Sequence, residues 1–100
     1  MAFHVALAAA THNELFVVLM NTIRGVLLEI RELGVGVSGS SANAVYNHAA
    51  LLETVRAHDV TAAARAMREH MRDAERILRR GLELKAIAWA GSDIPEQRSL

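Results

Sequence analysis

The only proline in this sequence of 100 residues is Pro95, close to its C-terminal end. Proline ends or kinks a helix, because it lacks a backbone N–H and its ring clashes with the preceding turn. The residues before it are rich in alanine, leucine, glutamate and arginine, which favour helix, and they show no strand-like alternation of apolar and polar side chains. The sequence therefore predicts an all-α fold, an antiparallel helical bundle of about four helices.

Short breaks divide the chain into helical segments. Asn13 and Asp59 stand where a side-chain oxygen can cap the helix that follows. The stretch 34–41, GVGVSGSS, is typical of a flexible loop, and Gly34 can end the preceding helix by taking the left-handed conformation. We expect one domain over residues 1–90 and a polar tail over 91–100. The helices predicted within that domain are Ala2–Ala10, Glu14–Leu33, Ala42–Ala57 and Val60–Ala88.

Apolar residues make up 52% of the chain, which is more than a domain of this size can bury. The segment Glu14–Leu33 is apolar around more than half of its circumference. A helix of this kind lies at the centre of a bundle or in a subunit interface. We therefore expect the chain to self-associate as a homo-oligomer.

Charge and composition exclude several classes of function. The 11 basic and 11 acidic residues give no net charge, whereas a nucleic-acid surface needs clustered cations. Arg76, Arg79 and Arg80 share their helix with acidic residues, which indicates a solvated face. No apolar stretch is long enough for a membrane span or follows the pattern of a signal peptide. Without cysteine there is no disulfide or thiolate site, and we expect a cytoplasmic protein.

Three of the five histidines lie on apolar helix faces, where they point toward the core. They are His4, His48 and His70, whereas His12 and His58 stand at helix junctions as turn residues. His48 and His70 are each roughly 15 to 17 Å from the turn between their helices, so an antiparallel hairpin places them at one level. The loop after Leu33 permits His4 to reach the same level.

Three neutral imidazoles at one depth of a bundle can form a facial site for a divalent metal such as Zn, Ni, Mn or Fe, with coordination positions left open. A cluster of hydrogen-bonded core histidines explains the same pattern without any metal. The residue pattern alone leaves both interpretations open.

Two stretches of the chain resemble a known family. Residues 3–13, FHVALAAATHN, are similar to the "FH..L..A..N" stretch of the FCD domain, the helical effector-binding domain of the FadR subfamily of GntR transcription regulators. Residues 48–59, HAALLETVRAHD, resemble its "H..LL.A...gD" stretch, which continues here with Ala63, Ala64, Met67 and His70. The resemblance covers about residues 1–78. His58 departs from it, since the family commonly has glycine there.

The resemblance implies a metal centre built from one aspartate and three histidines, which here are His4, His48 and His70. The aspartate would lie four residues before His4, one position ahead of Met1. We therefore expect a chain truncated at its N-terminus, part of a larger FCD-type bundle, whose metal binding is weak or absent because the fourth ligand is missing. The winged-helix DNA-binding portion of such regulators is also lacking, so we expect no binding to nucleic acid by this chain alone.

The implied function is ligand sensing and oligomerisation within a transcription regulator, with a small organic acid as effector and no enzymatic activity. One alternative is a structural helical oligomer that binds no ligand, which metal analysis would separate from a sensor. A second is a metal-dependent bundle enzyme similar to the DinB-like family, which turnover with added metal would reveal. No acidic residue lies one turn from His48 on its apolar face to act as the base of such an enzyme.

Overall fold

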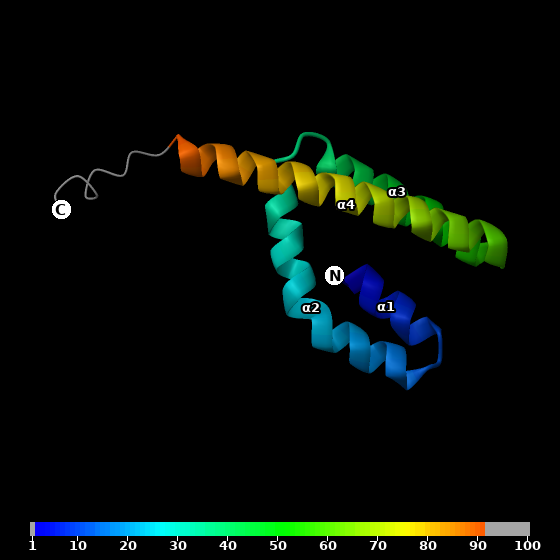
Figure 1. Ribbon diagram of the computed structural model, residues 1–100. Helices are drawn as coiled ribbons and strands as arrows, with labels where there is room; N and C mark the ends of the chain where they lie inside the picture. Colours follow the sequence, from blue (N-terminus) through cyan, green and yellow to red (C-terminus); the bar gives the residue numbers. More distant parts are fainter. Residues whose placement is uncertain (1, 92–100) are drawn as a thin grey trace.

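The computed structural model describes residues 2–91 and folds them into four helices joined by short turns (Figure 1). No strand occurs in this part of the chain, which confirms the predicted all-α class. Residues 92–100 of the expected polar tail lie outside the described residues. The helices are α1 (Ala2–Ala10), α2 (Glu14–Gly34), α3 (Ser40–Arg56) and α4 (Val60–Ala90).

The helices form two pairs. Helices α3 and α4 lie side by side as an antiparallel hairpin, whereas α1 folds back along α2 (Figure 1). The C-terminal end of α2 packs against α4, so the α1–α2 pair leans away from the hairpin while the N-terminus of α1 returns toward it (Figure 1). This arrangement decides which side chains of α1 can meet those of α3 and α4.

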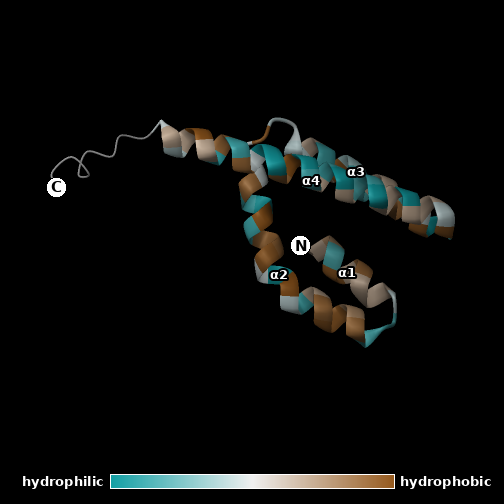
Figure 2. Ribbon diagram, viewed as in Figure 1, coloured by the Kyte–Doolittle hydropathy of each residue, from teal (hydrophilic) through white to brown (hydrophobic). Residues whose placement is uncertain are grey.

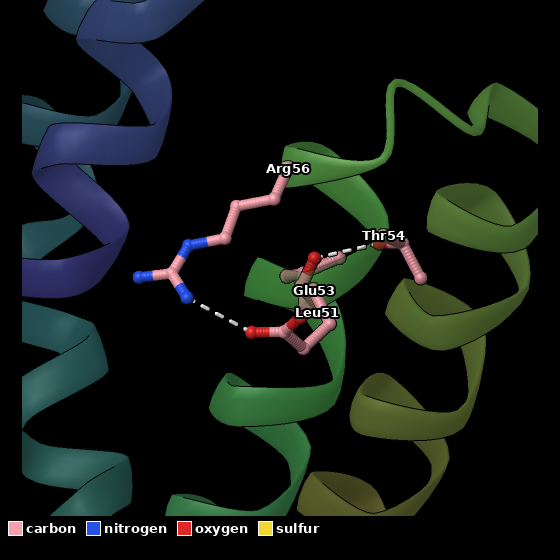
Figure 3. A network of polar contacts seen from close by, with 4 residues as sticks. All are labelled: Leu51, Glu53, Thr54 and Arg56. Atoms are coloured by element: carbon pink, nitrogen blue, oxygen red, sulfur yellow. Dashed lines mark hydrogen bonds and ion pairs between the residues drawn. The ribbon is translucent and has the colours of Figure 1, made fainter.

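Side-chain caps define the starts of α2 and α4, as predicted. Asn13 Oδ1 accepts a hydrogen bond from the Leu15 backbone N–H at 3.0 Å, and Asp59 Oδ1 accepts one from the Ala62 N–H at 3.0 Å. Each bond satisfies a donor that the first turn of a helix leaves without a partner. The last turns of α3 are held by an Arg56–Glu53 ion pair and by a bond from Thr54 Oγ1 to the Leu51 carbonyl (Figure 3).

His12 and His58 occupy the helix junctions that the sequence assigned to them, both with a left-handed backbone, at φ 56° and 55°. A side chain in this conformation costs roughly 1–2 kcal/mol, which glycine avoids at a smaller entropic cost. Replacing His58 by glycine is therefore expected to raise the free energy of unfolding by about 0.5–1 kcal/mol. The measurement is urea denaturation beside Ala57→Gly, whose right-handed φ of −78° predicts a loss instead. A destabilised His58→Gly protein would contradict the strain argument.

Gly34 does not end α2 in the way that the sequence indicated. Helix α2 continues through Gly34 into a right-handed Val35, and the left-handed glycine is Gly39, at φ 80° before α3. A Cβ on Gly34 would approach Ile77 Cγ2 to 2.8 Å, and one on Gly81 would overlap the backbone carbonyl of Leu33. The glycines therefore permit the close crossing of α2 over α4.

The hydrophobic core of this single chain is small. Among the described residues only Ala8 and Leu51 are buried apolar side chains, whereas Leu15 of α2 is 72% exposed. Apolar residues make up much of α2, most of all its N-terminal half (Figure 2). The radius of gyration is 17.8 Å, against about 13 Å for a compact domain of this length. Of the two placements expected for this helix, the single chain does not bury it centrally, and its burial in a subunit interface stays a prediction.

The predicted cluster of Arg76, Arg79 and Arg80 forms a solvated face of α4. Each pairs with an acidic residue three or four positions away, and the pairs are Arg76–Asp73 at 3.2 Å, Arg79–Glu75 at 2.7 Å and Arg80–Glu83 at 3.0 Å. Exposed pairs of this kind add little to stability. Within residues 2–91 we find no helix that combines the length and the hydropathy of a membrane span.

Candidate metal centre

Three imidazoles from three helices meet between the tip of α1 and the α3–α4 hairpin. His4 of α1, His48 of α3 and His70 of α4 each offer a ring nitrogen, and these nitrogens lie within 4.8 Å of one another. The ring centroids are 4.9 Å apart for His4 and His48, 5.4 Å for His4 and His70, and 4.9 Å for His48 and His70. The structure thus brings together the same histidines that the sequence singled out.

The hairpin explains the meeting of His48 and His70. The tight connection at His58 and Asp59 makes α3 and α4 antiparallel, and the two histidines lie at equal helical distances from it, as predicted. His4 reaches this level by a longer route, because the crossing of α2 over α4 and the turn after α1 carry it back to the hairpin. That step depends on tertiary packing, which the sequence permitted without dictating.

The surroundings keep all three imidazoles neutral at pH 7. His70 is buried and the other two are half-buried. Burial, together with the neighbouring rings of His48 and His70, lowers the pKa of His4 to about 4. Burial also lowers the pKa of His48 and of His70, and the carboxylate of Asp73 opposes this for His70. A neutral imidazole is the form that binds a metal ion.

These pKa shifts predict that the metal-free protein loses stability as the pH falls from about 6.5 toward 4. The unfolded imidazoles take up protons near pH 6.5, whereas the folded pKa of His4 is about 4 and those of His48 and His70 are also lowered. Between these values the unfolded state binds more protons, so acid favours unfolding. Urea denaturation at several pH values with a chelator measures the effect, and His4→Asn should flatten it. An equal pH dependence in His4→Asn would contradict the assignment.

A hydrogen bond between helices fixes the hairpin beside the site. Asn47, which is buried, donates through Nδ2 to Asp73 Oδ2 at 2.9 Å, and Arg76 holds the other carboxylate oxygen at 3.2 Å. These bonds lower the pKa of Asp73 and keep it charged. Asn47 adjoins His48, and Asp73 lies one turn after His70, so the bond sets the register of two of the three imidazoles. No sequence pattern predicted this pair, because the spacing of its two residues has meaning only once α3 and α4 are aligned.

One cation acts on the site from α2. The guanidinium of Arg31 contributes to the lowered pKa of His48, after burial and the nearby charge of His70. Arg31 is exposed and lies in the last turn of α2. The sequence did not single it out, since one arginine on a long helix has no pattern that distinguishes it from its neighbours.

The donor set fits a borderline divalent cation. Nitrogen donors suit Zn²⁺, Ni²⁺, Mn²⁺ and Fe²⁺, and three protein ligands leave coordination positions for a further group. Among the described residues no carboxylate belongs to the group of His4, His48 and His70. The side chains therefore suit a metal that is held on one face and accessible on the other.

Comparison with protein families matches residues 1–73 to the FCD domain, a stretch that contains all three histidines. The chain belongs to the FCD domain family. FCD domains are the effector-binding domains of GntR-type transcription regulators, which are regulatory proteins rather than enzymes, and they often bind metal. No curated protein and no solved structure matches the chain.

The matched residues include both stretches that resemble the family, residues 3–13 and 48–59. The FCD region spans α1, α2, α3 and the first half of α4, and it ends at Asp73, just beyond the histidine cluster. The crossing glycine Gly81 and the rest of α4 lie outside the matched stretch. The region that identifies the FCD domain is thus also the region that assembles the candidate site.

Proposed function

We propose that this FCD domain senses a small organic acid through a divalent metal held by His4, His48 and His70. The observation that carries the proposal is the convergence of three neutral imidazoles, one from each of three helices, within the stretch that matches the family. Bound there, the metal would supply a Lewis-acidic position for a carboxylate. The protein's own contribution is to hold three donors on one side and to keep them unprotonated.

We place the second anchor for the effector at Arg31. A carboxylate pairs well with a planar guanidinium, which can donate two parallel hydrogen bonds. The guanidinium of Arg31 is among the charges that lower the pKa of His48, and an acid that bridged the metal and Arg31 would join α2 to the hairpin. Such bridging would favour one placement of the α1–α2 pair over others, which is how a bound ligand shifts a conformational equilibrium.

The exposed apolar residues of α2 support self-association as the second part of the proposal. Many exposed large apolar side chains on one helix, in a chain with so small a core, favour burial against a partner surface. We assign that partner to a second copy of the chain, in keeping with a regulator that acts as an oligomer in the cytoplasm. DNA binding would belong to another domain, because this chain carries no net charge.

The experiment for the effector is calorimetric titration of the Zn²⁺-loaded protein with small mono-, di- and tricarboxylates. We expect binding that disappears with a chelator and weakens at least about tenfold in Arg31→Gln, which loses a charge-assisted pair. Arg24→Gln is the matched control, since Arg24 is another exposed arginine of α2, and it should bind like the wild type. Binding that is unchanged by both the chelator and Arg31→Gln would overturn the proposal.

Sedimentation velocity tests the oligomer. Association that increases with concentration supports it, and Leu15→Glu with Leu19→Glu, on the exposed face of α2, should abolish it. A monodisperse monomer at all concentrations would overturn self-association. An oligomer that retains no metal and binds no carboxylate would favour the structural helical oligomer, which is the alternative that the exposed face of α2 also supports.

A further inference from the structure

The ring of Phe3 lies flat against the imidazole of His48. The two ring centroids are 4.4 Å apart with an angle of 11° between the planes, which is a stacked arrangement. The same phenyl ring meets His4 edge-on, at 5.5 Å and 85°. Phe3 is half-buried at the start of α1, so one aromatic side chain touches two of the three imidazoles of the site.

A histidine ring needs an external constraint to present its nitrogen in a fixed direction, because rotation about its Cβ–Cγ bond has a broad minimum. In most metal sites that constraint is a hydrogen bond from the second ring nitrogen to a carboxylate or carbonyl group. Within the described part of the chain, the rings of His4, His48 and His70 make no such bond to a protein group. The constraint on His48 must therefore have another origin.

We infer that Phe3 is a positioning residue that fixes the ring plane of His48 toward the shared site and thereby sets its affinity for metal. A phenyl ring stacked at 4.4 Å opposes rotation of the imidazole about its Cβ–Cγ bond, because a turned imidazole would run into the phenyl ring. In this orientation the plane of the His48 ring stands at 84° to that of His4 and at 72° to that of His70. Because Phe3 precedes His4 directly, the same turn of α1 supplies one donor and orients another.

The inference rests on the proposed metal binding, and its test uses Co²⁺ as the probe. Co²⁺ affinity and the visible absorption of the bound ion, which reports ligand geometry, are measured for the wild type, Phe3→Leu and Phe3→Tyr. Leucine keeps the apolar contact and removes the flat ring, whereas tyrosine keeps the ring. Loss of an aromatic pair corresponds to roughly a two- to thirteenfold change in affinity, so Phe3→Leu should bind Co²⁺ more weakly by about that factor, with a changed spectrum. Phe3→Tyr should restore both properties.

Phe16→Leu is the matched control, since Phe16 lies on α2 and is 52% exposed. It should bind Co²⁺ like the wild type, and circular dichroism should show that all variants keep their helix content. Wild-type affinity and spectrum in Phe3→Leu, or equal weakening in Phe16→Leu, would overturn the role of Phe3 while the proposed metal binding stands. A wild-type protein that binds no Co²⁺ would overturn both, and these two results cannot be confused.

Discussion

Replacing His70 by alanine is expected to weaken divalent metal binding by more than about 100-fold, because changes outside the ligand set alone cost 10–100-fold. His70 is the most buried of the three imidazoles, and its ring lies close to both others. Its removal leaves His4 and His48 as two donors from different helices, which hold a metal less firmly. Calorimetric titration with Zn²⁺ measures the change.

The matched control for this variant is His12→Asn. It also removes one imidazole, and asparagine tolerates the left-handed backbone that His12 adopts. His12 is exposed and does not belong to the cluster, so the variant should bind Zn²⁺ like the wild type. Equal affinities in His70→Ala and the wild type would mean that any bound metal is held elsewhere.

Replacing Gly81 by alanine is expected to be strongly destabilising, although alanine is the better helix former by about 1 kcal/mol. The added Cβ would overlap the carbonyl group of Leu33, which is backbone and cannot rotate away. Helices α2 and α4 would have to separate, at a cost of about 1–3 kcal/mol or more for overpacking. Because this crossing carries α1 to the hairpin, the same variant should also weaken metal binding.

Two other helix glycines provide graded controls for Gly81→Ala. A Cβ on Gly25 meets nothing within 4 Å, so Gly25→Ala should stabilise the protein by up to about 1 kcal/mol. A Cβ on Gly34 meets the Ile77 side chain at 2.8 Å, and that side chain can shift, so Gly34→Ala should have an intermediate effect. Chemical denaturation of the three variants tests this order, and a neutral or stabilised Gly81→Ala would show that the crossing is looser than described.

Local sequence signals were sufficient for much of the fold. The starts of α2 and α4 follow from Asn13 and Asp59, whose side chains cap the next turn whatever surrounds them. The similar distance of His48 and His70 from the turn between α3 and α4 also follows from the sequence. It places the two histidines opposite each other, since a short connection makes the two helices run side by side. In both cases the determining interactions lie within a few residues along the chain or in one hairpin.

The remainder depends on how helices cross, which local patterns do not encode. Gly34 is of a residue type that commonly ends helices, but in the structure it allows α2 to approach Ile77 of α4. A sequence pattern could not indicate this role, because Ile77 is far from Gly34 along the chain. The Asn47–Asp73 bond and the stack of Phe3 on His48 become visible only when the helices are placed. The apolar face of α1 marked His4 as a candidate ligand and the family resemblance agreed, but neither the periodicity of α1 nor its loop fixes the position of His4 at the hairpin.

We propose that His4, His48 and His70 together bind one divalent metal ion. The most direct measurement is a crystal structure of the chain grown with Zn²⁺, with anomalous diffraction recorded at the zinc absorption edge. We expect a single strong peak about 2.0–2.1 Å from one nitrogen of each imidazole. Crystals that contain zinc only at other positions, with no peak between the three rings, would contradict it.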